Sequence, residues 1–102
     1  MVIELLKFKI PAQMREIFIQ KDEESWTTVL AKYPGFLGKE VWISPHDLTE
    51  VVIVVHWQSR EQWKAIPETE LEAIAQKFDQ SLGFSYEMSE FSEYQVRKFP
   101  QH

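Results

Sequence analysis

The chain contains no cysteine and only three glycines among its 102 residues. The lack of cysteine excludes disulfides, thiolate metal sites and a cysteine nucleophile. The glycines, at positions 35, 38 and 83, are too few to build a glycine-rich phosphate loop. No apolar run is long enough for a membrane span, and MVIELLKFKI lacks the marks of a cleavable signal. We therefore expect a cytoplasmic protein with no membrane partner.

Basic side chains are also scarce and scattered. Eleven lysines and arginines stand against sixteen acidic residues, which gives a net charge of −5. A nucleic-acid partner is not expected, because phosphate recognition needs a basic face. The three histidines, His46, His56 and His102, show no spacing typical of metal ligands. The sequence predicts neither a metal site nor a cofactor.

What the sequence does contain is typical of one folded domain over residues 1–102. Hydrophobic residues make up 44% of the chain and charged residues 26%, which is ordinary for a globular protein. Apolar periodicity separates strands from helices along the chain. The pattern predicts strands over 2–10, 36–44, 50–57 and 84–99, and helices over 12–32, 59–66 and 69–82.

The predicted order is β-α-β-β-α-β, which is the ferredoxin-like plan of an α+β fold. Right-handed crossovers then place the helices on one face of a four-stranded antiparallel sheet. Ser59 and Thr69 each start a capping-box pattern, and Gly83 occupies a helix C-cap position. The apolar parity of the last strand changes along its length, so we expect a bulge or kink near Ser89–Ser92.

Both faces of the two middle strands are apolar, although two helices can cover only one face of the sheet. In EVVIVVHW, we expect Val52, Val54 and His56 to face the helices and Trp57 to face away. Which alternate residues of the strand over 36–44 face the helices stays open, because the length of the hairpin loop is not fixed. An apolar sheet face rarely stays exposed in a monomer. We expect a homodimer through the sheet faces; the alternative is a monomer with scattered exposed apolar residues.

Glu4 and His56 are the candidate catalytic residues. If Val2 pairs with Gln58 in neighbouring antiparallel strands, Glu4 lies beside His56 on the helix-covered face. A histidine oriented by a carboxylate can act as a general base near neutral pH. Such a base could take a proton from a phenolic or enolisable substrate. The alternative is a structural hydrogen-bonded pair that closes the end of the core.

Asp22 and Trp63 are the candidate ligand-binding residues. Asp22 and Ser25 fall on the apolar side of the first helix, where they could orient a ligand, unless a kink turns them to solvent. Trp63 is expected on a short helix over the end of the sheet, where it could line an aromatic pocket. Packing in the core or the dimer interface is the alternative for each tryptophan.

Two consecutive segments, YPGFLGKEVWISP and EVVIVVHWQSREQW, carry a resemblance to a known family. They resemble the dimeric α+β barrel superfamily and, within it, the antibiotic biosynthesis monooxygenase-like domains. The shared features are the Pro34-Gly35-Phe36 turn before a strand, Trp57 at the end of the next strand, and Ser59 followed by Trp63. The chain as a whole resembles a subgroup of short members that carries no defined activity.

The resemblance implies a homodimer with a cleft between helices and sheet in each subunit. Some members oxygenate polycyclic aromatics without metal or flavin, and others degrade haem. The haem-degrading members use a histidine, a tryptophan and an asparagine, whose positions correspond to about Gln76, Ile66 and Leu5 or Leu6 here. All three residue types are absent at those positions, which argues against haem degradation.

The sequence leaves open whether the protein is an enzyme. One hypothesis is a homodimeric protein that binds an apolar or aromatic small molecule and resembles cofactor-independent monooxygenases. The other is a non-catalytic dimeric carrier or interaction module, in which His56 and Glu4 are purely structural. Neither hypothesis specifies the ligand.

Overall fold

The computed structural model describes residues 1–99, so the predicted domain range of 1–102 extends beyond the described residues at 100–102. Within residues 1–99, no helix combines the length and the apolar character that a membrane span requires. The elements follow the predicted order along the chain. They are β1 (Val2–Lys9), η1 (Ala12–Met14), α1 (Arg15–Asp22), η2 (Glu23–Thr27), α2 (Thr28–Leu30), β2 (Phe36–Ile43), β3 (Glu50–Trp57), α3 (Arg60–Lys64), α4 (Glu68–Leu82) and β4 (Glu87–Gln95).

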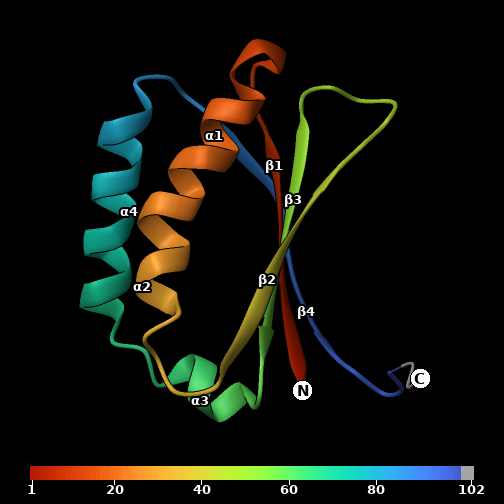
Figure 1. Ribbon diagram of the computed structural model, residues 1–102, viewed down its shortest axis with the longest axis vertical. Coiled ribbons are helices and arrows are strands. Elements are labelled where there is room, and N and C mark those ends of the chain that lie inside the picture. The colour runs from red at the N-terminus through yellow and green to blue at the C-terminus, as the bar shows by residue number, and fades with distance from the viewer. Residues whose placement is uncertain (100–102) are drawn as a thin grey trace.

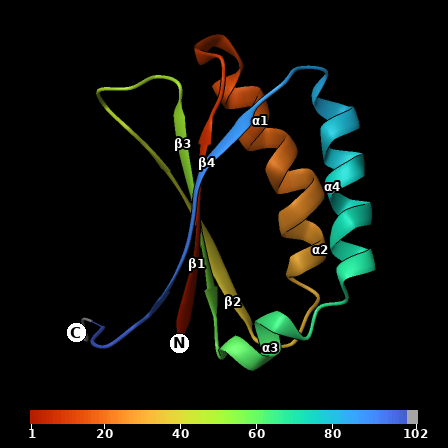
Figure 2. The ribbon, with the colours of Figure 1, turned by 180° about the vertical axis from the view of Figure 1, so that it is seen from behind.

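The four strands form one antiparallel sheet in the order β2-β3-β1-β4. The long helical segments α1–α2 and α4 lie side by side on one face of this sheet, and α3 lies at its end (Figure 1). The view from behind shows the same two layers, with all the helices on one side of the strands (Figure 2). The predicted ferredoxin-like α+β fold is confirmed.

The register between β1 and β3 differs from the prediction by one residue. Glu4 lies opposite Val55, and His56 lies opposite Ile3. Because side chains alternate along a strand, a shift of one residue exchanges the two faces of β3. The predicted placement of Glu4 beside His56 is therefore wrong, and so is the expectation that Trp57 faces a partner's sheet. The residues of β3 that face the helices are Val51, Ile53, Val55 and Trp57.

A bulge at the start of β2 settles the parity that the sequence left open. Phe36 pairs with Trp57 and Gly38 pairs with His56, so Leu37 is an extra residue on β2. Gly38 has a φ of 150°, which suits this irregular backbone. Beyond the bulge, Lys39 lies opposite Val55 and therefore points towards the helices. A second bulge lies in β4 where Ser89 is skipped in the pairing with β1, as predicted.

The predicted helix over 12–32 is not one regular helix. It is divided into η1, α1, η2 and α2, and η2 is a π-helical turn over Glu23–Thr27. A π-turn widens the helix locally and changes the direction in which the flanking side chains point. Asp22, the last residue of α1, is only 3% exposed and points towards the sheet.

The core between helices and sheet contains a cluster of aromatic rings among aliphatic side chains. Phe18 of α1 is fully buried, and its ring lies 5.2 Å from Phe8 of β1 and 5.2 Å from Phe78 of α4. Tyr86 completes the cluster, with its ring 5.3 Å from that of Phe18. Tilted and edge-on aromatic contacts of this kind add to the free energy gained by burial. They hold α1 and α4 against the same part of the sheet.

Helix ends follow the predicted signals in two cases out of three. The Ser59 hydroxyl accepts a hydrogen bond from the Gln62 amide at the start of α3, and Gly83 ends α4 with a φ of 73°. The capping box predicted at Thr69 is wrong, because α4 begins one residue earlier, at Glu68 after Pro67, with no side-chain cap. Pro67 directly precedes α4 with a φ of −60°, a value that suits a helix start.

Gly35 is predicted to be far less replaceable than Gly83. Its φ is 91°, and a Cβ atom there would lie 2.7 Å from Cβ of Gln62. Gly83 has a comparable φ of 73° but open space around it. Gly83→Ala should therefore cost about 1–2 kcal/mol of unfolding free energy from backbone strain. Gly35→Ala should cost about 1–3 kcal/mol more from overlap. Urea unfolding of the two variants measures the difference, and equal losses would contradict the close contact.

Candidate functional site

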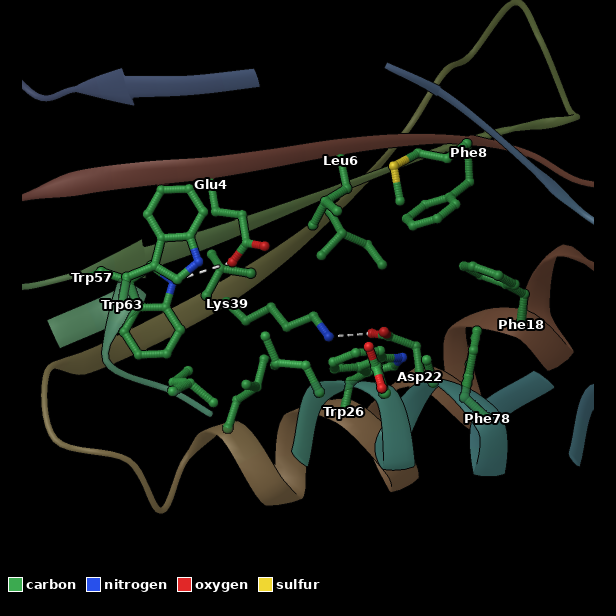
Figure 3. Close-up of a pocket in the computed structure, with 18 of the residues that line it drawn as sticks. Glu4, Leu6, Phe8, Phe18, Asp22, Trp26, Lys39, Trp57, Trp63 and Phe78 are labelled. Atoms are coloured by element: carbon green, nitrogen blue, oxygen red, sulfur yellow. Dashed lines mark hydrogen bonds and ion pairs between the residues drawn. The ribbon is translucent and has the colours of Figure 1, made fainter. Parts of the chain in front are cut away.

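A cavity of about 460 Å³ lies between the helices and the sheet. This volume falls in the range typical of small-molecule sites. Its walls come from all four strands on one side and from α1, η2, α2, α3 and α4 on the other. Figure 3 shows ten of the lining side chains with labels. Several aromatic side chains line the walls together with aliphatic ones; the aromatic residues are Phe8, Phe18, Trp26, Trp57, Trp63, Phe78 and Tyr86.

Glu4 presents its carboxyl group to this cavity from β1. Trp57 donates a hydrogen bond from Nε1 to Oε1 of Glu4 across 3.2 Å. Burial raises the pKa of the Glu4 carboxyl above its ordinary value, and the bond from Trp57 and the charges of Lys64 and Lys39 oppose that rise. A carboxylate whose pKa is raised by burial is a stronger proton acceptor than an exposed one.

Asp22 and Lys39 form a buried ion pair in the same cavity. The Lys39 ammonium lies 2.5 Å from Oδ2 of Asp22, and the two side chains are 4% and 5% exposed. Lys39 also donates a hydrogen bond to Oγ1 of Thr27 across 2.9 Å. Desolvation raises the pKa of Asp22, while the charge and hydrogen bond of Lys39 lower it. Figure 3 shows the pair across the cavity from the carboxyl group of Glu4.

Of the predicted site residues, the structure brings Glu4, Asp22 and Trp63 together around one cavity. Trp63 lies on α3 as predicted, is 7% exposed, and has the Lys64 ammonium 4.1 Å from its ring centre. Ser25 does not line the cavity, because the π-turn separates its direction from that of Asp22. These placements leave the functional roles of the residues as predictions.

His56 lies on the opposite face of the sheet from the cavity. Its Nε2 donates to Oε2 of Glu40 across 2.6 Å, and Trp42 donates from Nε1 to Oε1 of the same carboxylate across 3.3 Å. These two bonds lower the pKa of Glu40. The predicted histidine base and Glu4 are therefore separated by the sheet and cannot act on the same ligand.

Lys39 is the site residue that reasoning from the sequence missed. In a strand that alternates regularly from Phe36, position 39 would face away from the helices. The signal that could have revealed it is Gly38, because a glycine inside a strand often marks a bulge. The second missed feature is the wall position of Trp57, which follows from the register of β3.

The arrangement can hold a flat apolar molecule and handle a proton on it. Aromatic walls bind a ring by area and stacking, Glu4 can accept a proton, and Lys39 supplies positive charge. Among residues 1–99, no group of three or more His, Cys, Asp or Glu side chains could hold a metal ion.

Comparison with known proteins identifies the family. The family model for antibiotic biosynthesis monooxygenases matches residues 1–77, so the chain belongs to this family. No curated protein sequence matches the chain.

Solved structures share the fold at low sequence identity. SnoaB, a cofactor-independent oxygenase from Streptomyces nogalater, is 15% identical with a TM-score of 0.67, over 96% of this chain and 94% of SnoaB. A dimeric ferredoxin-like protein from an uncultured marine organism is 13% identical with a TM-score of 0.75, over the full length of both chains. At such identities the likeness establishes the fold alone.

Proposed function

We propose that the chain is a single domain over 1–102 that forms a homodimer and binds an apolar aromatic compound in the cavity of each subunit. The proposed reaction is oxygenation of that compound without metal or flavin. The observation that carries the proposal is the cavity of about 460 Å³, which has aromatic walls and the carboxyl group of Glu4 inside. The family and the structural neighbour SnoaB, a cofactor-independent oxygenase, support the reaction type.

The reaction needs only a substrate that can become a carbanion or enolate. Glu4 removes a proton from a CH₂ group activated by neighbouring rings or a carbonyl. The resulting anion reduces O₂, one oxygen atom enters the product as C=O, and the other leaves as water. The four electrons come from the substrate, so the balance requires no further reductant.

Anthrone provides a direct test, because its activated CH₂ group becomes the second carbonyl of anthraquinone. Oxygen uptake is measured with purified protein, a metal chelator and no added flavin. Ala75 lines the cavity from α4, so Ala75→Trp should fill part of the cavity and abolish both anthrone binding and uptake. Uptake that persists unchanged in a folded Ala75→Trp variant would contradict a reaction inside the cavity.

The face of the sheet opposite the helices supports the homodimer. Ile3 and Leu5 of β1 are only half-buried there, and Trp42 of β2 is 48% exposed beside the buried Val52 and Val54. Apolar faces of this kind usually mark an interface. We propose that a second copy of the chain covers this face with its own sheet. The ferredoxin-like neighbour from the marine organism is also dimeric. The Glu40–His56 pair then belongs to the interface.

Trp42→Asp should weaken the dimer, because it places a charge in the proposed interface. The expected rise in the dimer dissociation constant is about thirtyfold or more, which corresponds to the loss of one interface hot spot of about 2 kcal/mol. Ile17→Asp is the matched control, because Ile17 is 42% exposed on α1, on the opposite side of the molecule. Sedimentation equilibrium measures both variants. Equal effects, or a monomeric parent protein, would contradict the interface.

A non-catalytic carrier is the second candidate. It is favoured by the position of His56, which leaves the cavity without the histidine base that the sequence suggested. A carrier would bind anthrone in the cavity and show no oxygen uptake above the uncatalysed rate. The same anthrone experiment therefore separates the two candidates.

A further inference from the structure

We propose that Lys39 is a specificity-determining residue that binds the oxygen of a phenol or enol on the ring ligand and holds that oxygen as an anion. This inference rests on the proposed function, since it concerns the ligand of the same cavity. It specifies the substrate class: an apolar ring compound with one weakly acidic O–H group. The supporting observations concern the hydrogen bonds, burial and charged neighbours of Lys39.

The hydrogen bonds of the Lys39 ammonium leave one donor for a ligand. An ammonium group has three N–H donors. Within the described part of the chain, one is directed to Asp22 Oδ2 and one to Thr27 Oγ1. The side chain is 4% exposed, so water from the outer surface barely reaches it. Lys39 is one of the residues that line the cavity, so its third donor is available to a ligand bound there.

The position of Lys39 is specified by the local backbone. The bulge between Phe36 and Gly38 turns residue 39 to the helix side of β2. Asp22 meets it from the last turn of α1, directly before the π-turn that contains Thr27. The bulge before Lys39, the end of α1 at Asp22 and the π-turn at Thr27 thus bring three side chains together at one ammonium group.

The remaining charged groups around the cavity favour a neutral ligand that ionises after binding. The titratable groups that line the cavity together with Lys39 are Asp22 of α1, Glu4 of β1, Glu68 and Glu72 of α4, and Tyr86 before β4. Glu68 and Glu72 are exposed, so an anion would meet repulsion on approach. A neutral phenol avoids this repulsion. Inside the cavity its O–H bond breaks, the proton goes to Glu4 or to water, and the oxygen keeps the electron pair beside Lys39.

The ionisation of bound 1-naphthol tests this role by a spectroscopic signal. The naphtholate anion absorbs at longer wavelength than the neutral naphthol, so the midpoint of its ionisation can be titrated in the complex. An opposite charge in contact lowers a pKa by about 1–3 units. We expect the midpoint for bound 1-naphthol to lie at least about one pH unit below that of free 1-naphthol.

The variant for this test is the double substitution Lys39→Met with Asp22→Leu, which avoids leaving Asp22 unpaired. It should raise the midpoint above that of free 1-naphthol, because only the carboxylates then remain. Lys77→Met is the matched control, since Lys77 is an exposed lysine on α4 that does not line the cavity. It should leave the midpoint close to that of the parent protein. If the double variant does not fold, the proposed role of Lys39 is tested by the ionisation midpoint of 1-naphthol bound to the parent protein alone.

Naphthalene, which has the same rings without oxygen, separates failure of this inference from failure of the proposed function. If both compounds bind and the midpoint is not lowered in the parent protein, the role of Lys39 is overturned while the apolar site stands. An equal midpoint in the folded double variant would also overturn it. If neither compound binds, the proposed function fails and the inference fails with it.

Discussion

Glu4→Gln is expected to lower the rate of oxygen uptake with anthrone by about 10²–10⁴-fold, the usual contribution of a general base. Glutamine keeps the size of the side chain, and its amide oxygen can still accept the hydrogen bond from Trp57. It cannot take a proton. Anthrone binding should therefore persist, and the loss should appear in kcat. A fully active variant would exclude Glu4 as the base, and a variant that no longer binds anthrone would assign it to positioning.

The stability of Glu4→Gln provides the control for this loss of activity. Burial raises the pKa of Glu4 in the folded protein above the ordinary value of 4.5. Protonated Glu4 therefore stabilises the fold at acidic pH, and this stabilisation is lost as the pH rises through the folded pKa. Glutamine stays neutral throughout. The variant should be more stable than the parent protein near neutral pH and should lose this advantage below the ordinary pKa.

Lys39→Met alone is expected to destabilise the protein by about 3–5 kcal/mol, because it leaves the buried carboxylate of Asp22 without its partner. That loss is a large fraction of the stability of a domain of this size. Replacing both members, Lys39→Met with Asp22→Leu, should cost little or even stabilise the fold, since no charge then remains buried. Urea unfolding at one fixed protein concentration measures both variants, because the proposed dimer would make stability depend on concentration.

The effect of Lys39→Met should also depend on pH. Burial of Asp22 already raises its pKa, and removal of the lysine takes away the charge that opposes this rise. Asp22 will therefore bind a proton more readily in the variant, and the destabilisation should shrink as the pH falls. A loss below about 1 kcal/mol at neutral pH, typical of an exposed ion pair, would contradict the buried position of the pair.

The fold could be predicted from the sequence, but the register of the sheet could not. The β-branched run over 50–57, the apolar stripe of 69–82 and the terminal Gly83 were sufficient for the order of elements. In β3, however, both parities are apolar, so the hydrophobic pattern does not say which face meets the helices. The cross-strand contact of Glu4 depends on that choice. A shift of one residue moved His56 from the cavity to the outer face.

The candidate site was predictable where the backbone is regular. Asp22 and Trp63 follow from the helical period and the Ser59 cap, and both line the cavity. The position of Lys39 in the cavity wall could be predicted only by placing a bulge at Gly38. That bulge reverses which side chains of β2 face the helices. The bulge in β4 changes the apolar parity and was predicted from it, whereas the bulge in β2 and the π-turn leave little trace in hydrophobic periodicity. Here both irregular segments adjoin the ion pair that we assign to ligand recognition.

Native mass spectrometry of protein purified gently from its own cells tests the central claim most directly. The chain mass is 12.1 kDa, and the predicted species is two chains with one small molecule retained in each. The same preparation of Ala75→Trp should give the dimer without the compound. A monomer would contradict the proposed sheet-to-sheet dimer, and a compound retained equally by Ala75→Trp would contradict binding in the cavity.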